Sequence, residues 1–269
     1  MAGKKIAVIG AGNMGGALMT GWIRSGHIKP EQITAVDPVV ALLDMRKQEL
    51  GVCVSTDARA VIEKQDVVVL GVKPQVWPAV VSGFKDLLHP NQLVMSIMAG
   101  VRIAALEQAL GNVPVVRVMP NILAQVCAAG SGVCAGSKVK KEQLELALGL
   151  LNAVGVAVVV SEKQMDAVTG LAGSGPAYVY AMIDAFADGG VRAGLSKDVA
   201  LALSVQTVLG AAKMVAESGE HPAVLKDRVT SAGGTTIAGL HALEQGGFRA
   251  ALMDAVLAAA CRSEELGRQ

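Results

Sequence analysis

The 269-residue chain has few aromatic side chains and no excess of charge of either sign. Phe, Trp and Tyr together make up 3% of the residues, too few for a surface on which nucleic-acid bases stack. The formal net charge is +1 and no stretch is strongly basic, so the electrostatic signature of nucleic-acid binding is missing. We therefore expect no nucleic-acid partner.

Cysteine and histidine are scarce and scattered. The chain has four of each, and the cysteines include no Cys-x-x-Cys pair and no neighbouring histidine at metal-ligand spacing: Cys53, Cys127, Cys134 and Cys261. This pattern argues against a disulfide framework and a zinc motif. We expect free thiols in a reducing cytoplasm, and no metal.

Long hydrophobic runs are also missing. The longest apolar stretch, 144–160, is interrupted by Glu145, Asn152 and Gly155, and its pattern indicates a helix followed by a strand rather than a membrane span. Near the N-terminus two lysines precede a short apolar run, which leads into a glycine-rich segment without a signal-peptide cleavage site. We expect no signal peptide and no membrane partner.

Small and aliphatic residues dominate instead. Hydrophobic residues make up 52% of the chain and charged residues 17%, which is enough apolar material for a substantial core. The length fits one large domain or two moderate ones.

A dinucleotide-binding pattern opens the chain. The β-branched-rich run Lys5–Ile9 is followed by glycines at positions 10, 12 and 15, an apolar helix to Arg24, and a second strand, 33–36, that ends in Asp37. The three glycines permit a tight turn, a close approach to the pyrophosphate and close helix–strand packing. Because strand, loop, helix, strand and acid occur in this order, we predict that the segment binds a dinucleotide.

Asp37 bears on the choice of cofactor. At this position an acid accepts a hydrogen bond from the ribose 2′-hydroxyl of NAD and repels the extra phosphate of NADP. No arginine follows at positions 38–40 to hold that phosphate. This rule favours NADH, but the carboxylate can also turn away from the ribose, so the preference between NADPH and NADH stays open.

Strands and helices continue to alternate through the first half of the chain. Buried-strand patterns at 52–54, 66–72, 93–97 and 115–119 are separated by helical or loop segments, which predicts an α/β fold with an open parallel, Rossmann-type sheet. Ligands bind at the carboxyl ends of such strands. Lys73 lies in one of these strand-end loops, so we expect it to contact the cofactor; the alternative is a solvated loop lysine.

Strand signals disappear from Lys163 onward. Helical patterns rich in alanine and leucine cover 166–172, 177–193, 198–216, a segment around Leu225, 235–244 and 250–266. We predict a Rossmann domain over 1–162 and an all-helical domain over 163–269. The apolar surface of these helices is covered either within the chain or by a second copy, and the small size of this half favours a dimer.

A loop of small and hydroxyl-bearing residues, 230–236, opens into one of these helices. The N–H groups at a helix start lack intrahelical partners, and glycines allow an anion to approach them closely. The loop suits a small carboxylate, whereas the alternative is an ordinary Ser/Thr helix cap.

Several stretches together resemble the pyrroline-5-carboxylate reductase family. They are GAGNMG at 10–15, VKP at 72–74, RVMPN at 117–121, GSGPAY at 173–178 and DRVTSAGGTTIAGLHALE at 227–244. The resemblance covers essentially the whole chain. It implies a Rossmann domain followed by an all-α dimerisation domain, and the reduction of 1-pyrroline-5-carboxylate to L-proline with NADPH or NADH, the last step of proline biosynthesis. It also implies a homodimer, which this family often assembles into a decamer of five dimers.

The resemblance also assigns residues. Thr236 would be the catalytic residue, hydrogen-bonded to the ring nitrogen, and the substrate carboxylate would bind to Ser231, Gly234 and Thr235. The cofactor would bind along Gly10, Gly12, Asn13, Met14, Gly15, Val72, Lys73, Ala99 and Gly100, beside Asp37. The chain departs from the family pattern at Asp57, Ala172, Ile122-Leu123 and Ala232, where the family usually has asparagine, serine, Thr-Pro and proline; none of these changes removes a proposed catalytic group.

Two other functions are compatible with a dinucleotide-binding domain. A β-hydroxyacid dehydrogenase has the same layout but uses a helix lysine with an asparagine one turn further on, and the helix from Pro176 to Ala193 has neither. A catalytically silent dinucleotide sensor would have no use for a second, carboxylate-sized site. A protonated imine accepts hydride readily, so the lack of an obvious His/Asp or Lys pair fits the reductase.

Overall fold

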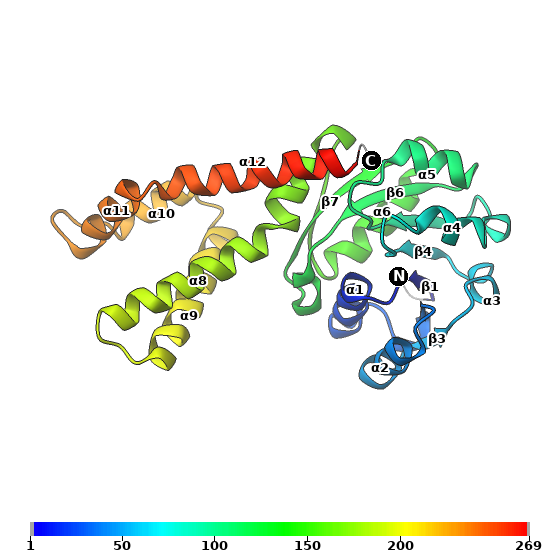
Figure 1. Cartoon of the computed structure of the whole chain (residues 1–269), viewed down its shortest axis with the longest axis horizontal. Coiled ribbons are helices and arrows are strands. Elements are labelled where there is room, and N and C mark those ends of the chain that lie inside the picture. Colours follow the sequence, from blue (N-terminus) through cyan, green and yellow to red (C-terminus); the bar gives the residue numbers. More distant parts are fainter. Residues whose placement is uncertain (1–2, 268–269) are drawn as a thin grey trace. The chain divides into compact units, whose positions relative to one another are not determined.

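The computed structural model describes residues 3–267 and divides into two compact units (Figure 1). The first comprises Met1–Ser174 and Leu257–Gln269, and the second comprises Gly175–Val256. The first unit is an α/β sheet domain, and the second is built from helices alone among its described residues.

One eight-stranded sheet organises the first unit, in the order β3-β2-β1-β4-β5-β6-β7-β8. Its strands are β1 (Ile6–Ile9), β2 (Ile33–Val36), β3 (Cys53–Ser55), β4 (Val67–Leu70), β5 (Leu93–Ser96), β6 (Val115–Met119), β7 (Ala129–Ala135) and β8 (Gly155–Val159). The first six run parallel. Their order, 3-2-1-4-5-6, is that of a doubly wound dinucleotide-binding sheet, whose strand order reverses between β1 and β4. The predicted Rossmann-type α/β fold is confirmed.

The last two strands depart from the all-parallel pattern expected from the sequence. β7 pairs antiparallel with β6, and β8 pairs parallel with β7. The sequence of β7, AGSGVCA, gave little strand signal because most of its residues are small and not β-branched. Small residues are needed here: a Cβ atom on Gly132 would lie 2.7 Å from Val168 Cγ1, so this strand packs closely against its neighbouring helix.

Helices cover both faces of the sheet. The helices of this unit are α1 (Asn13–Arg24), α2 (Val40–Leu50), α3 (Arg59–Ile62), α4 (Trp77–Ser82), α5 (Ile103–Leu110), α6 (Lys141–Asn152) and α7 (Met165–Val168). Shorter 3₁₀ turns lie at Pro30–Gln32, Lys85–Leu87, Ile122–Val126 and Glu162–Gln164, and a π-helical turn follows α7 at Thr169–Gly173. Buried side chains of α1, α2 and α6 pack on one face of the sheet, and those of α3, α4 and α5 pack on the other.

Alternate residues of each central strand belong to different cores. Ile6 and Val8 of β1 pack in the core beneath α1, whereas Ala7 and Ile9 pack in the core on the opposite face. β4 divides in the same way, and all four of its residues are buried. This two-sided burial explains why the strand appears in the sequence as an unbroken apolar run.

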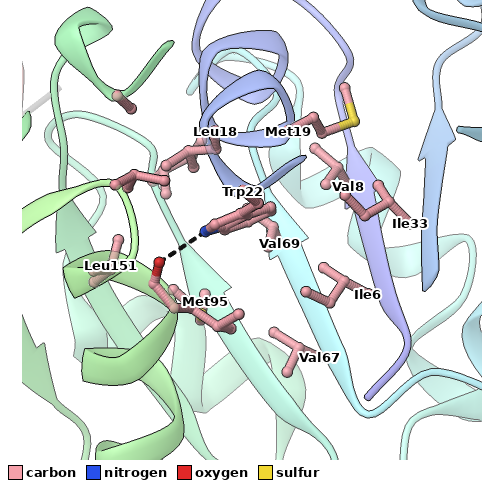
Figure 2. Close-up of a cluster of buried hydrophobic side chains, with 14 of the residues drawn as sticks. Ile6, Val8, Leu18, Met19, Trp22, Ile33, Val67, Val69, Met95 and Leu151 are labelled. Atoms are coloured by element: carbon pink, nitrogen blue, oxygen red, sulfur yellow. Dashed lines mark hydrogen bonds between the residues drawn. The ribbon is translucent and has the colours of Figure 1, made fainter. Parts of the chain in front are cut away.

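Trp22 fixes α1 against the sheet and α6 (Figure 2). Its side chain is fully buried, and its indole Nε1–H donates to the Leu150 carbonyl at 2.8 Å. Leu150 lies in the last turn of α6, where carbonyls have no intrahelical partner. One side chain therefore packs α1 and caps α6 at the same time.

The second unit buries little of its own apolar surface. It contains α8 (Gly175–Arg192), α9 (Lys197–Ser218), α10 (Pro222–Arg228), α11 (Thr235–Gln245) and the first part of α12 (Phe248–Leu266). The α8 and α9 helices pack together, yet large apolar side chains of both remain exposed, among them Phe186, Leu203 and Leu209. Among the described residues, α9 is the one helix that is long and apolar enough to cross a membrane.

The boundary expected between residues 162 and 163 marks the end of the strands, and as a domain division it stays a prediction. The compact units divide twelve residues later, after Ser174, because the segment 162–174 packs with the sheet. Glu162 Oε1 accepts the Ile103 N–H at 2.7 Å, and Ser263 Oγ donates to Asp166 Oδ1 at 2.7 Å, which links the end of α12 to α7.

We predict that Trp22→Phe lowers the free energy of unfolding by about 2 kcal/mol, because the buried Leu150 carbonyl loses its donor. The midpoint of urea unfolding, followed by circular dichroism, measures the change. Trp77→Phe is the matched control, because the Trp77 indole is only partly buried and its N–H has no hydrogen-bond partner among residues 3–267. Equal losses in both variants would contradict the capping role of Trp22.

Candidate functional site

Two glycines at this end of β1, one in the loop before α1 and one in the first turn of α1, leave no room for a side chain. Gly10 has a φ of +98°, and a Cβ atom there would lie 2.6 Å from the Gly71 carbonyl oxygen. A Cβ atom on Gly15 would lie 2.3 Å from the Gly10 carbonyl oxygen. The first glycine therefore lets the loop turn beside β4, and the third lets α1 start directly against the loop.

Gly12 differs from these two, because a Cβ atom there would meet no heavy atom within 4 Å. It is the N-cap of α1, and among the described residues no side chain caps this helix end or adds an acid to its first turn. The first N–H groups of an α-helix lack intrahelical partners and carry a partial positive charge. The open space above Gly12 and the uncapped start of α1, at Asn13 and Met14, fit the pyrophosphate of a dinucleotide.

Asp37, at the end of β2, binds the same loop. Its Oδ2 accepts the Ala11 N–H at 3.1 Å, and its Oδ1 accepts the Val39 N–H at 3.0 Å. The Gly10 N–H donates to the Val36 carbonyl at 2.8 Å, so the loop and the end of β2 are joined by backbone as well. Each carboxylate oxygen keeps a free lone pair, so Asp37 can hold the loop and still accept from a ribose hydroxyl.

Arg46 of α2 is a loop contact that was not expected from the sequence. Its guanidinium donates to the carbonyls of Ala11 and Gly12, at 3.1 and 3.3 Å. An arginine within a helix is usually a solvated surface residue, and nothing in its sequence position marks this one. The sequence feature that could have pointed to this contact is Gly16, a further glycine directly after the fingerprint. A glycine at such a position indicates that another group approaches the backbone closely.

The loop after β4 lies beside the glycine-rich loop, and the end of β5 lies beside the loop after β4. The Gly71 N–H donates to the Ile9 carbonyl at 2.8 Å, which places the start of the Val72-Lys73 loop next to Gly10. A Cβ atom on Gly71 would lie 3.2 Å from Ile97 Cδ1 at the end of β5. The ends of β1, β4 and β5 therefore meet at one edge of the sheet, and the Lys73 side chain is exposed there.

The β5 loop is held by segments distant in the sequence. Gly100 has a φ of +76°, and a Cβ atom on it would approach the Gly267 backbone at 3.4 Å. Beyond Gly100, Glu162 Oε1 accepts the Ile103 N–H and lies 3.1 Å from the Nη1 atom of Arg117. Ala99 itself is exposed.

The RVMPN motif is mainly structural within this unit. Arg117 is 4% exposed, and it lies opposite Cys134 in the antiparallel pairing of β6 with β7. Burial raises the pKa of the Cys134 thiol, and the nearby Glu162 carboxylate adds to this effect. Asn121 donates through Nδ2 to the Ala172 carbonyl at 3.0 Å and accepts the Leu123 N–H, so it caps the turn that follows. Both hydrogen bonds of the Asn121 side chain are therefore made within the chain.

In the second unit, the predicted carboxylate-binding residues lie together at the start of α11. Gly234 is the N-cap, no side chain caps this end among the described residues, and Gly233 has a φ of +68°. Ser231 Oγ lies 2.3 Å from where a Cβ atom on Gly234 would be, so its hydroxyl sits over the helix start. Thr235 and Thr236 form the first turn of α11. Among residues 3–267, no group of three acidic, histidine or cysteine side chains is arranged as metal ligands.

Comparisons with known proteins find a matching protein family for each of the two parts of the chain. Residues 162–266 match the family model described as pyrroline-5-carboxylate reductase dimerisation, and residues 5–100 match that of the coenzyme F420-dependent NADP oxidoreductases. The pyrroline-5-carboxylate reductase of Methanosarcina acetivorans is 49% identical over 270 residues, which cover 100% of both chains.

Solved structures agree over the same length. A pyrroline-5-carboxylate reductase from Coxiella burnetii matches with a TM-score of 0.91 and 37% identity, covering 98% of both chains. The pyrroline carboxylate reductase of Plasmodium falciparum, solved with NADP bound, matches with a TM-score of 0.88 and 31% identity over 99% of both chains.

We predict that alanine at two glycines of the loop changes different properties: the affinity for NADPH at Gly12 and the free energy of unfolding at Gly10. Gly12→Ala should change the free energy of unfolding by less than about 0.5 kcal/mol, because its Cβ has space, and should weaken NADPH binding at least roughly tenfold by filling the approach to α1. Gly10→Ala should cost about 2 kcal/mol or more, because of its positive φ and the clash with Gly71. Thermal unfolding and calorimetric titration with NADPH measure both, and undiminished binding by folded Gly12→Ala would contradict the cradle.

Proposed function

Because this chain belongs to the pyrroline-5-carboxylate reductase family, we propose that it reduces 1-pyrroline-5-carboxylate to L-proline with NADPH or NADH, the last step of proline biosynthesis. The observation that carries this proposal is the match to reductases of the family along the whole chain, through the cofactor unit and the helical unit alike. The nicotinamide cofactor supplies the hydride, and the protein's residues bind and orient the two ligands.

The first unit would hold the cofactor. The N–H groups at the start of α1 and the space above Gly12 suit the pyrophosphate, which supports the roles proposed for Gly10, Gly12, Asn13, Met14 and Gly15. Val72, Lys73, Ala99 and Gly100 would line the cofactor along the ends of β4 and β5. The exposed ammonium of Lys73 is free to approach a phosphate or ribose.

The second unit would hold the substrate. Its carboxylate suits the uncapped start of α11, through the N–H groups of Gly234 and Thr235 and the hydroxyl of Ser231. Thr236, on the next position of the same turn, would hydrogen-bond the ring nitrogen. The two charged or polar ends of a small ring are then held by one helix start.

The reduction of a protonated imine needs few catalytic side chains. A protonated imine carbon accepts hydride without a strong acid or a covalent nucleophile, so orientation and the exclusion of water make up most of the catalysis. A hydroxyl at the ring nitrogen is sufficient, because it stabilises the nitrogen as its charge changes during the reaction.

The helical unit also supports a homo-oligomer. Its exposed apolar side chains on α8 and α9 are a surface that a second copy would cover, which accounts for the apolar character of α9 without a membrane. We propose a homodimer, with the decamer of five dimers as the further assembly, acting in the cytoplasm and without a nucleic-acid or membrane partner.

The rival functions are not favoured. A dinucleotide sensor or a hydroxyacid dehydrogenase would not account for a full-length match to reductases of this imine. The direct test is optical: the loss of NADPH and NADH absorbance with 1-pyrroline-5-carboxylate as substrate, together with the formation of proline. Absence of turnover with both cofactors, in folded protein that binds them, would overturn the reductase proposal.

Thr236→Ala should lower kcat by roughly a hundredfold, because the lost hydroxyl acts at the reacting ring, and should leave the dissociation constant for NADPH within about twofold. Thr230→Ala is the control, because the Thr230 hydroxyl already donates to the Lys226 carbonyl at 2.7 Å. Steady-state kinetics and NADPH titration separate the two quantities. An unchanged kcat in Thr236→Ala would remove Thr236 from the mechanism.

Asp37→Asn should raise the ratio of kcat/KM with NADPH to kcat/KM with NADH by roughly tenfold, because a neutral amide no longer repels a 2′-phosphate. Asp44→Asn, an exposed change on α2, is the charge-matched control. The ratio is measured with both cofactors at one substrate concentration. If it stays at the wild-type value, Asp37 serves only to hold the loop.

A further inference from the structure

The Ala11 peptide, in the middle of the glycine-rich loop, is held from two sides. Its N–H donates to Asp37 Oδ2 at 3.1 Å, and its carbonyl accepts from Arg46 Nε at 3.1 Å. The same guanidinium donates through Nη2 to the Gly12 carbonyl at 3.3 Å. Two consecutive carbonyls of the loop are therefore bound to one side chain from α2.

Arg46 is not an ordinary surface ion pair. Its side chain is only 13% exposed, whereas its carboxylate partner, Glu49, is 54% exposed and lies 3.3 Å from Nη1. Such a pair contributes little to stability. The two loop carbonyls are the partners that the fork-shaped guanidinium reaches with its other nitrogens, and a lysine ammonium would not reproduce that geometry.

Gly16 makes room for this guanidinium. A Cβ atom on Gly16 would lie 2.3 Å from Arg46 Nη2 and 2.4 Å from Cζ. Gly16 is fully within α1, where glycine is unfavourable relative to alanine. The position costs helix stability and in return allows Arg46 to reach the loop.

From these contacts we infer that Arg46 is a positioning residue for the dinucleotide, an inference that rests on the proposed binding of NADPH or NADH. Carbonyl oxygens repel a phosphate, whereas the N–H groups at the start of α1 attract it. Arg46 holds the carbonyls of Ala11 and Gly12 to itself, so that the N–H groups are the polar atoms available to the pyrophosphate. Its positive charge also raises the electrostatic potential of the loop.

The test compares four variants of the full-length enzyme. Arg46→Met removes both charge and fork, Arg46→Lys keeps the charge alone, and Gly16→Ala keeps the arginine but occupies its place. Lys47→Met removes an exposed charge from the next position of α2 as the control. Calorimetric titration gives the dissociation constant for NADPH, and kinetics at saturating NADPH give kcat.

We expect Arg46→Met to raise the dissociation constant for NADPH roughly tenfold or more, with kcat at saturating cofactor within about twofold of wild type. Gly16→Ala should weaken binding in the same direction, Arg46→Lys should recover only part of the loss, and Lys47→Met should bind like wild type. A general loss of folding would lower kcat and the melting temperature together, whereas loop positioning raises KM for NADPH alone.

Wild-type affinity for NADPH in folded Arg46→Met, or equal affinity in Arg46→Lys and wild type, would overturn the inference while leaving the reductase proposal intact. If Arg46→Met does not fold, Arg46→Lys and Gly16→Ala decide by the same criteria. Wild-type enzyme that neither binds nor oxidises NADPH or NADH would overturn the proposed function first, and the inference with it.

Discussion

The close approach of Gly10 to the Gly71 carbonyl is the contact on which the candidate cofactor site depends. It occurs where the strand order reverses, between β1 and β4, and only a residue without a Cβ atom and with a positive φ fits there. The Gly71 N–H continues the ladder to Ile9, and the Gly10 N–H continues it to Val36. The loop is thereby fixed to three strands before any ligand arrives, so the start of α1 has a defined position.

The core beneath the sheet keeps α1 in that position. Val8 lies 3.0 Å from where a Cβ atom on Gly15 would be, so the helix rests directly on the strand that precedes it. Further along α1, the fully buried Trp22 binds the end of α6. A helix start offers an anion useful N–H groups only if it does not move when the anion binds, because reorganisation subtracts from affinity. The packing of α1 along its whole length therefore helps to hold the N–H groups of the candidate cofactor site in position.

Local sequence patterns predicted the helices and strands, but they did not predict the contacts between residues distant in the sequence. The alternation of buried residues and the order of glycines and acid in the first 37 residues depend on neighbours in the sequence, so β1, α1, β2 and the sheet class could be predicted. The contacts of Arg46 could not, because they join side chain and backbone across more than thirty residues. β7 was missed for a related reason: Val168 requires a glycine at position 132, and only the folded chain brings these two residues together.

The helical unit shows why the candidate substrate loop needs more than its own chain. α11, which begins at the loop with Thr235, has no buried residue in the single chain. A helix of this length is marginal in water without tertiary packing. The loop N–H groups can bind a carboxylate only while α11 is formed, so whatever covers its apolar residues also stabilises the binding site. In the homodimer proposed above, a second copy would provide that cover, and assembly and substrate binding would then depend on the same surface.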